Sequence, residues 1–383
     1  MATYKEQNKL NVPHLRFPGF HGEWEKCRIG DYGKVVTGNT PPTKDVENYI
    51  DGQYLWASPA DLGTIKSITE TNTKLSSKGF AKTRILPKGS VLVTCIGSTI
   101  GKMGMAMKEM ATNQQINSVV VNEDNNNEFV YYAIQSAFPR YLSSIAVQAV
   151  PIVSKSAFEQ LSNKRPCLQE QEKIGSLFAL LDERIATQSK LIEDLKKLKS
   201  AIIDYAINSL DTDFAKFGSL YEMAGEGGTP ATSNASFYDN GKIPFIKIDD
   251  LKKKYLTENK DFITELGLQK SSAWLVPSRS ILFSNGATIG EITITTYPVC
   301  TKQGILGIVP KPNIDVEFLY YFMSSSYFKK AVSRIVTEGT MKTAYLKDIN
   351  NIRCPIPIKE KQQDIAKMPS ALNSKIDFEQ RFN

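Results

Sequence analysis

Residues 38–43 read GNTPPT, and residues 227–232 read GGTPAT. The two stretches lie 189 positions apart (227 − 38 = 189), and TNQQI at 112–116 returns as TKQGI at 301–305 with the same offset. One register that holds over more than a hundred residues indicates an internal duplication and not a compositional coincidence. The chain is therefore expected to contain the same domain twice.

Each copy has the pattern of an α+β domain. Short β-rich runs lie between Gly, Asn and Pro turns, as in SVLVTCI and INSVVV of the first copy and SILFS and EITITTY of the second. One apolar stretch in each copy predicts a helix, EFVYYAIQSAF from Glu128 and VEFLYYFMSSSYF from Val316. The fold class predicted is thus α+β, in two pseudo-repeated domains.

A long helix is predicted after Pro166, because no Gly or Pro occurs between Gly175 and Gly218. Apolar residues recur from Ile174 with a period of 3.5, which favours a coiled coil of about 60 Å that could hold two domains apart. An amphipathic helix lying flat on a core is the alternative. The residues expected to face a partner helix are Ile174, Leu177, Leu181, Leu191, Leu195, Leu198 and Ile202.

A second and shorter helix is predicted in KEKQQDIAKMPSALNSKIDFEQRFN, from Lys359. Pro369 is expected to interrupt it, since a proline inside a helix costs about 3 kcal/mol. The far end of the first helix, at Leu195, Leu198 and Ile202, would then lack part of its partner.

These segments divide the chain into five parts. They are a leader (1–23), the first repeated domain (24–165), a central coiled-coil helix (166–210), the second repeated domain (211–355) and a short distal coiled-coil helix (356–383).

Composition limits the class of protein. A formal charge of +7 is compatible with a polyanionic partner such as nucleic acid. The five cysteines are far apart, without a zinc or disulfide pattern, and no apolar run is long enough to span a bilayer. We expect a cytoplasmic protein with no membrane and no metal.

Catalytic patterns are weak in this sequence. His14 and His21 are the only histidines and both lie in the leader, which leaves little for a triad or a histidine nuclease. SLYEMAGEGGTP at 219–230 looks like a loop for S-adenosylmethionine, but its first copy has Val36 where the second has Gly225. The acidic residues around ENK at 258–260, with Asp249 or Asp250, are a chance-level nuclease pattern.

The turns GSTIGK at 97–102 and GATIGE at 286–291 are not phosphate-binding loops. Only three residues separate the glycines, Met103 follows the lysine, and the second copy has no lysine. We interpret them as equivalent turns between strands, in which glycine permits a positive φ and a close backbone approach.

Several motifs together resemble the specificity (S) subunit of type I restriction-modification systems, over essentially the whole chain. They are the leader VPHLRFPGFHGEW running into IGDY, the two TP turns, STIG and ATIG with the glutamine after them, and P-x-L-x-EQEKI…LLDERI. The resemblance implies two target-recognition domains that each read half of a split site on double-stranded DNA, with two antiparallel helices as the spacer.

The resemblance also implies partners. Adenine methyltransferase (M) subunits would dock on the chain, and whether a restriction and translocase (R) subunit joins stays open. S-adenosylmethionine, ATP and Mg²⁺ are expected only in the partner subunits, so the chain by itself would not be an enzyme, but the non-catalytic part of a site-specific deoxyribonuclease and methyltransferase complex.

Base-edge contacts are expected from polar loop residues, because amides pair with adenine and guanidinium or ammonium groups with guanine. The two domains would meet the same groove about 34 Å apart. The candidates are Ser98, Thr99, Lys102, Asn113 and Gln114 in the first copy and Thr288, Lys302, Gln303 and Lys342 in the second.

Two other functions remain open on the sequence. One is a repeat scaffold that binds only protein, without DNA specificity. The other is a fused methyltransferase or nuclease, which the missing motifs disfavour.

Overall fold

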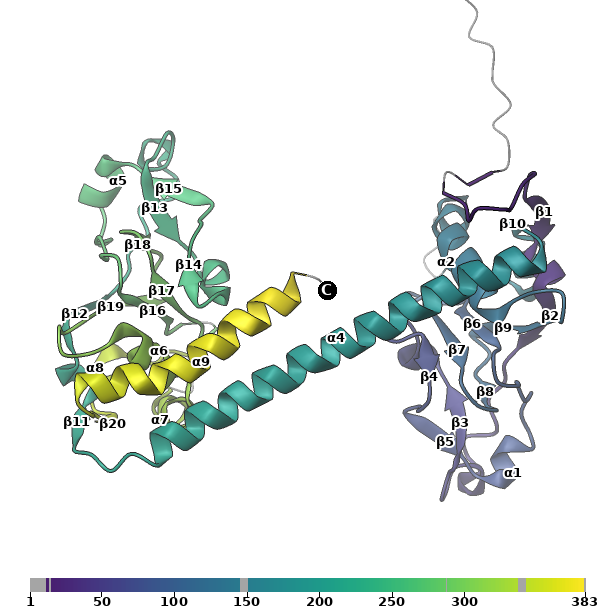
Figure 1. Ribbon diagram of the computed structural model, residues 1–383, viewed down its shortest axis with the longest axis horizontal. Coiled ribbons are helices and arrows are strands. Elements are labelled where there is room, and N and C mark those ends of the chain that lie inside the picture. The colour runs from purple at the N-terminus through teal and green to yellow at the C-terminus, as the bar shows by residue number, and fades with distance from the viewer. Residues whose placement is uncertain (1–11, 14, 145–150, 287, 337–341, 382–383) are drawn as a thin grey trace, which may run out of the picture. The chain divides into compact units, whose positions relative to one another are not determined.

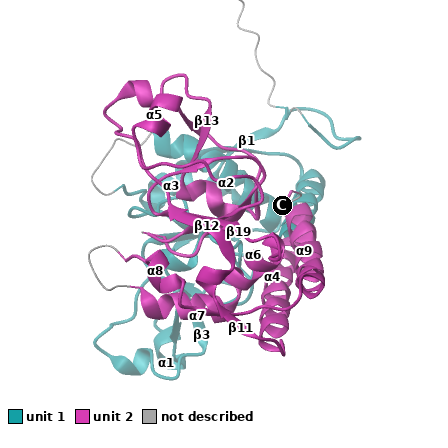
Figure 2. Cartoon of the chain, turned by 90° about the vertical axis from the view of Figure 1, so that its left-hand side faces the viewer, with its two compact units in different colours: residues 1–185 teal, residues 186–383 magenta. Residues whose placement is uncertain are grey.

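The computed structural model describes residues 12–13, 15–144, 151–286, 288–336 and 342–381. His14 lies outside these ranges, and His21 is exposed. The chain forms two compact units, residues 1–185 and 186–383, coloured separately in Figure 2.

The first unit is built on a five-stranded mixed sheet with the order β2-β9-β6-β7-β4 (Figure 1). Its strands are β2 (Gly33–Thr37), β9 (Ile116–Val121), β6 (Val91–Thr94), β7 (Met103–Ala106) and β4 (Ser67–Ile68). Neighbours are antiparallel except β7 and the edge strand β4, which are parallel. Every residue of β6 is buried, Thr94 included, so this strand does not alternate between buried and exposed residues.

Smaller elements complete the first unit. A three-stranded sheet has the order β5-β3-β8, and a two-stranded one pairs β1 with β10. Their bounds are β5 (Thr73–Leu75), β3 (Tyr54–Ala57), β8 (Ala111–Thr112), β1 (Glu25–Arg28) and β10 (Ser162–Arg165), and the helices are α1 (Ser77–Phe80), α2 (Asn127–Ser144), α3 (Lys155–Gln160) and the start of α4 (Leu168–Asn208).

The second unit repeats this topology strand for strand. Its sheets have the orders β12-β19-β16-β17-β14, β15-β13-β18 and β11-β20. The strands are β12 (Tyr221–Glu226), β19 (Ile305–Pro310), β16 (Ile281–Ser284), β17 (Ile292–Thr295), β14 (Tyr255–Leu256), β15 (Asp261–Ile263), β13 (Ile243–Ile246), β18 (Cys300–Thr301), β11 (Phe214–Lys216) and β20 (Arg353–Pro355). The predicted duplicated α+β architecture is confirmed.

The helical stretch of the second unit differs from the single helix that was expected. It is divided into α6 (Val316–Ser324) and α7 (Ser326–Ile335), followed by α8 (Leu346–Ile349), while α5 (Glu265–Gln269) lies earlier in the unit. Ser325 leaves the helical conformation, and its Oγ accepts a hydrogen bond from Phe328 N at 3.2 Å, which starts α7 anew. In the first unit α2 continues through the same position.

Helix α9 (Lys359–Gln380) runs antiparallel to the second half of α4, beside it in Figure 1. The Lys199 ammonium donates to Asn373 Oδ1 at 2.9 Å, and Gln188 Nε2 donates to Glu379 O at 3.2 Å. Pro369 lies inside α9 without ending it, so the expected interruption is wrong. One missing backbone donor does not break a helix that tertiary packing supports.

The expectation that the far end of α4 lacks part of its partner is wrong for two of the three residues named for it. Because the two helices are antiparallel, the start of α9 lies beside that end, and Leu195 and Ile202 are half-buried. Leu198 does remain 48% exposed. Apolar surface is also left open in the first half of α4, where Leu177, Leu180, Leu181 and Ile185 are exposed and Ile174 is half-buried, and at Leu191 and Tyr205 in the second half.

Besides lying antiparallel to α9, the second half of α4 buries an apolar stripe against the core of the second unit. Its buried residues are Ile192, Ile203 and Ile207, a spacing near 3.6 residues per turn. Ile203 and Ile207 belong to the core of the second unit, together with Phe318 of α6 and Phe328 of α7. Across the part of the chain that is described, no helix is long and apolar enough to cross a bilayer.

Candidate nucleic-acid interface

Three loops gather in the first unit: the TP loop after β2, the turn 97–102 and the turn 112–115. A Cβ on Gly38 would stand 2.2 Å from the carbonyl oxygen of Thr112, so only glycine lets the TP loop approach this closely. Asn39 N donates to Thr112 O at 2.9 Å. Gln115 Nε2 donates to Ile96 O at 3.4 Å and so ties the turn 112–115 to the loop that carries the turn 97–102.

The same three loops gather in the second unit. A Cβ on Gly227 would stand 2.2 Å from the carbonyl oxygen of Thr301, which repeats the contact of the first copy. Asn285 N donates to Gly304 O at 3.0 Å, so the second turn lies beside TKQG. The two units thus keep these backbone contacts while the side chains around them differ.

The glycines of the two turns behave largely as expected. Gly97, Gly101 and Gly290 have positive φ values of 99°, 89° and 108°. Gly286 has no positive φ, and a Cβ there would lie 3.4 Å from Gly304 Cα, an ordinary van der Waals distance, so the structure does not explain the glycine at this position.

Most predicted reading residues of the first unit are accessible. Ser98, Lys102 and Gln114 are exposed, and Thr99 is half-buried. Gln114 Oε1 accepts a hydrogen bond from Thr40 Oγ1 at 2.5 Å, which holds the amide against the TP loop.

Asn113 requires a correction. Its side chain is only 7% exposed, its Oδ1 accepts from Gln115 N at 3.0 Å, and its Nδ2 donates to Gln115 Oε1 at 3.0 Å. These bonds shape the turn, because an asparagine that bonds two residues ahead mimics a backbone turn. Asn113 therefore shapes the turn, and its buried side chain is a weaker candidate for a base contact than the exposed Gln114.

In the second unit Thr288, Lys302, Gln303 and Lys342 are all exposed. Lys342 lines a cavity of about 520 Å³ together with Gly290 and Glu291, so the structure places it beside the second turn. Glu291 occupies the position that corresponds to Lys102 of the first copy. The candidate lysines of the second unit, Lys302 and Lys342, come from other loops.

Arg84 is a candidate that the sequence did not reveal. It is exposed, its Nη1 donates to Thr37 O at 2.7 Å, and its backbone N donates to Asn39 Oδ1 at 2.9 Å. The guanidinium is thereby held beside the TP loop. The repeat offers no signal for it, because Ala273 occupies the matching position.

The two patterns suggestive of catalysis lie in a strand and in a group of surface ion pairs. Gly225 lies within strand β12, paired with Gly307, and is not in a cofactor loop. The acidic residues around 249–261 do line one cavity of about 670 Å³. Asp249 and Glu258 are paired with Lys252 and Lys253, each at 3.1 Å. Within the described ranges no group of three or more His, Cys, Asp or Glu side chains is placed to hold a metal ion.

A buried lysine joins the sheet of the second unit to α9. Lys254 precedes the edge strand β14 and is 3% exposed, and its ammonium donates to Glu317 Oε2 of α6 at 2.6 Å and to Ser370 Oγ of α9 at 2.9 Å. It also lies over the Tyr321 ring, 4.8 Å from the centroid. The three elements therefore meet at one ion pair, which we call the lysine junction of the second unit.

The first unit has the equivalent junction at Lys66, which precedes the edge strand β4. Its ammonium donates to Glu128 Oε2 of α2 at 2.8 Å and pairs with Asp182 Oδ2 of α4 at 2.5 Å. Burial alone would lower the pKa of Lys66, but hydrogen bonds to Asp182, Glu128 and Tyr132 outweigh it and raise that pKa. In each unit one lysine thus links the sheet to the long helix that packs on it, α4 in the first unit and α9 in the second.

The junction of the second unit predicts acid sensitivity. Burial raises the pKa of Glu317, but hydrogen bonds from Lys254, Ser370 and Tyr255 outweigh it, and the pKa lies below its usual 4.5. A carboxyl with a depressed folded-state pKa stabilises above its unfolded pKa and loses that contribution as the pH falls through the folded value.

We therefore expect the urea midpoint of the second unit to fall between about pH 6 and about pH 3, and to fall less in Glu317→Gln, which has no carboxylate to titrate at this site. Equal acid dependence in the wild type and in Glu317→Gln would contradict the assignment.

The comparisons with known proteins agree with one another. Residues 21–197 and 211–383 match a family described as type I restriction modification DNA specificity domain. The chain is 26% identical over 370 residues to the type I restriction enzyme MjaIX specificity subunit of Methanocaldococcus jannaschii, which covers 88% of this chain and 85% of the relative. It is 25% identical over 228 residues, 56% of each chain, to the EcoR124I/EcoR124II specificity subunit of Escherichia coli.

Solved structures support the fold. The chain is similar to the crystal structure of a type I restriction-modification system S subunit from M. genitalium, with a TM-score of 0.61, 17% identity and coverage of 98% of this chain and 93% of that one.

Proposed function

The chain belongs to the family of type I restriction-modification DNA specificity proteins, and from that premise we propose that it reads a bipartite target on double-stranded DNA, one half with each unit. One observation supports this proposal above all. The TP loop and the two turns that follow it come together in each unit, and we call this group the three-loop cluster. Its backbone contacts recur in both units, while its polar side chains differ. The bases between the two halves stay unread.

The chemistry is proposed to reside in partner subunits. Adenine methyltransferase subunits would dock on the chain and supply S-adenosylmethionine, and a restriction subunit, where one joins, would supply the ATP- and Mg²⁺-dependent steps. This division follows from the family and from the weak catalytic patterns of the sequence. The setting we propose is the cytoplasm.

A gel shift in a salt series tests this proposal. Binding of the chain together with a methyltransferase subunit should weaken steeply with rising salt, because lysine and arginine contacts to phosphates release counterions. The isolated chain should neither methylate nor cleave DNA. A protein-only scaffold would leave DNA unshifted at every salt concentration, and a fused enzyme would modify DNA without the added subunit.

Gln114 and Gln303 occupy equivalent positions in the two copies, so single substitutions at them test the proposal. Gln114→Ala should relax one base position in one half of the target, and Gln303→Ala one position in the other half, each at a cost of about 1–3 kcal/mol against the preferred base. The readout is the set of methylated sequences for each variant. A uniform loss of binding to all sequences would show a phosphate contact or a structural role instead.

The spacer role predicts the effect of an insertion in α4. Thr187 lies between Asp182, which bonds to the first unit, and Gln188, where the pairing with α9 begins. Seven added residues there lengthen the helix by about 10 Å without disturbing either set of contacts, and about 10 Å corresponds to about three base pairs.

We therefore expect the insertion to lengthen the unread spacer while both half-sites stay the same, as determined from the methylated sequences. New half-site sequences would contradict a spacer role for α4.

A further inference from the structure

The start of α4 is attached to the first unit at a buried glutamine. Gln171 is only 1% exposed, and its Oε1 accepts a hydrogen bond from Asn126 N at 3.1 Å, directly before α2. A Cβ on Gly175, one turn further along α4, would lie 2.9 Å from Glu128 Cβ, so glycine lets the two helices approach each other here. These contacts are the first attachment of α4 to the first unit.

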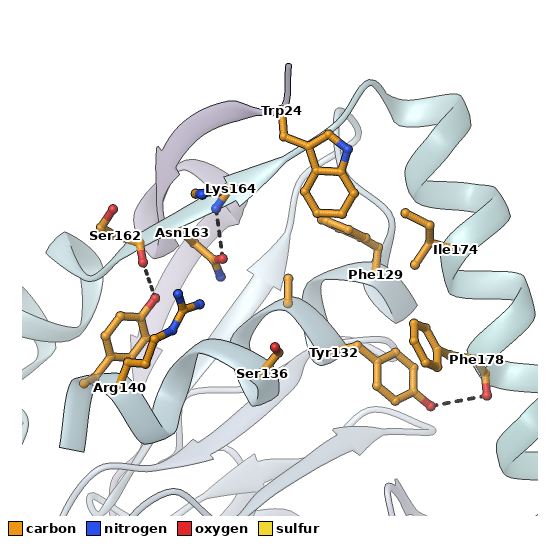
Figure 3. A pocket seen from close by; sticks show the side chains of 12 residues that line it. Trp24, Phe129, Tyr132, Ser136, Arg140, Ser162, Asn163, Lys164, Ile174 and Phe178 are labelled. Carbon is orange, nitrogen blue, oxygen red and sulfur yellow. Dashed lines mark hydrogen bonds between the residues drawn. The ribbon is translucent and has the colours of Figure 1, made fainter. Parts of the chain in front are cut away.

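The junction at Lys66 is the second attachment. The Lys66 ammonium pairs with Asp182 Oδ2 of α4 at 2.5 Å, and the Tyr132 hydroxyl of α2 donates to the same oxygen. Figure 3 shows Tyr132 beside Phe178 of α4, and the centroids of the two rings lie 4.6 Å apart. Gln171, Phe178 and Asp182 follow one another at helical spacing, so they share the face of α4 that meets α2.

Two attachments fix the direction of a helix, whereas a single one allows it to pivot. Gln171 and Asp182 are 11 residues apart (182 − 171 = 11), which is about 16 Å along the helix axis. The edge strand β4 begins directly after Lys66, so the second attachment holds the edge of the main sheet. The angle between this sheet and α4 therefore depends on the junction at Lys66.

A small change in this angle has a large effect at the other end of α4. The helix runs without a break from Leu168 to Asn208, and Ile203 and Ile207 of its last turns lie in the core of the second unit. From Asp182 to Asn208 there are 26 residues (208 − 182 = 26), about 39 Å, so a tilt of about 5° moves the far end by about 3.4 Å. This displacement equals the rise of about one base pair.

The corresponding lysine of the second unit bonds to a different helix. Lys254 donates to Ser370 Oγ of α9 at 2.9 Å, while α4 is held in that unit by Ile203 and Ile207, which are 4% and 5% exposed. The junction of the first unit thus joins a sheet directly to the helix that links both units.

We propose that the junction at Lys66 fixes the number of unread bases in the target, with Lys66 and Asp182 as positioning residues that need not touch DNA. One base more or fewer between the half-sites requires a shift of about 3.4 Å and a turn of about 34° about the duplex axis. The ion pair opposes both movements, because a charge-assisted hydrogen bond depends on distance and on angle. This inference rests on the proposed reading of a split target and names what sets its spacing.

Duplexes with altered spacing test the proposal. They carry the motif that the wild type methylates, with the wild-type number of unread bases or with one base more or fewer, and a gel shift with the methyltransferase subunit gives the affinity for each. Asp182→Ala should improve binding to the altered duplexes, relative to the wild-type spacing, by at least about tenfold, equivalent to about 1.4 kcal/mol. Lys66→Met should do the same from the other side of the contact.

The ratio of affinities separates positioning from stability. Loss of stability would weaken binding to all three duplexes alike and leave their ratio unchanged. The Asp182 side chain is 39% exposed, so Asp182→Ala is expected to stay folded. Glu183→Ala is the matched control, because Glu183 is the next residue of α4, is exposed and carries the same charge. It should keep the wild-type ratio.

Two outcomes would overturn the proposal. One is a wild-type ratio in Asp182→Ala or in Lys66→Met. The other is an equal relaxation in Glu183→Ala, which would show that the charge of α4 is responsible and not the junction. A wild type that binds all three duplexes equally, or binds none of them, would instead contradict the proposed function itself.

Discussion

Exchanging residues 24–165 for the matching domain of another specificity subunit is expected to change one half of the methylated sequence completely and to leave the other half intact. The physical reason is that each unit has its own sheets, its own core and its own three-loop cluster. The measurement is sequencing of methylated adenines in cells that express the exchanged chain with its methyltransferase partner.

The reciprocal exchange of residues 211–355 is the matched control, and it should alter only the other half. A change in both halves after either exchange would show that the two units do not read independently.

Replacing Lys254 by methionine is expected to destabilise the second unit by about 3 kcal/mol. The substitution keeps an apolar stem of similar length but leaves Glu317 without its cation in a largely buried position, and removal of one partner of a buried pair costs about 3–5 kcal/mol. The lower end applies because the Glu317 side chain is 26% exposed. The measurement is the urea midpoint of the second unit.

Two controls accompany this prediction. Lys66→Met in the first unit should cost less, since the carboxylates of Glu128 and Asp182 are 30% and 39% exposed and water compensates them in part. Lys253→Met, at an exposed ion pair next in sequence, should cost below about 1 kcal/mol. A Lys254→Met variant as stable as Lys253→Met would refute the role of the junction.

Much of the fold could be predicted because the chain repeats itself. The offset of 189 between GNTPPT and GGTPAT correctly indicates two domains with equal topology. Glycine at 38 and 227 recurs because a Cβ at either position would collide with a carbonyl oxygen. A steric requirement of this kind can be predicted from the sequence, because glycine recurs at the same position of both copies.

The lysine junctions and the buried face of α4 could not be predicted from the sequence. The lysine junctions depend on residues far apart in the chain, such as Lys66, Glu128 and Asp182, and Lys66 and Lys254 differ by 188 and not 189. A heptad count also cannot decide which face of α4 is buried, because the core of the second unit selects Ile203 and Ile207 over Leu198. Contacts over such sequence distances become visible only in the folded chain.

The candidate site shows the same limit. The repeat indicated that the turns 97–102 and 286–291 are equivalent, but it could not distinguish Asn113 from Gln114 as candidate base-contacting residues. Burial separates them, since Asn113 is bonded within its own turn and Gln114 is exposed. Arg84 was missed because a residue specific to one copy has no repeated counterpart.

The most direct test of DNA reading by two units is to sequence the methylated adenines in cells that express this chain with its methyltransferase partner. The expected result is a single bipartite motif, with two specific halves separated by a fixed number of unread bases. Methylation at one continuous motif, or at adenines without a shared sequence, would contradict the account.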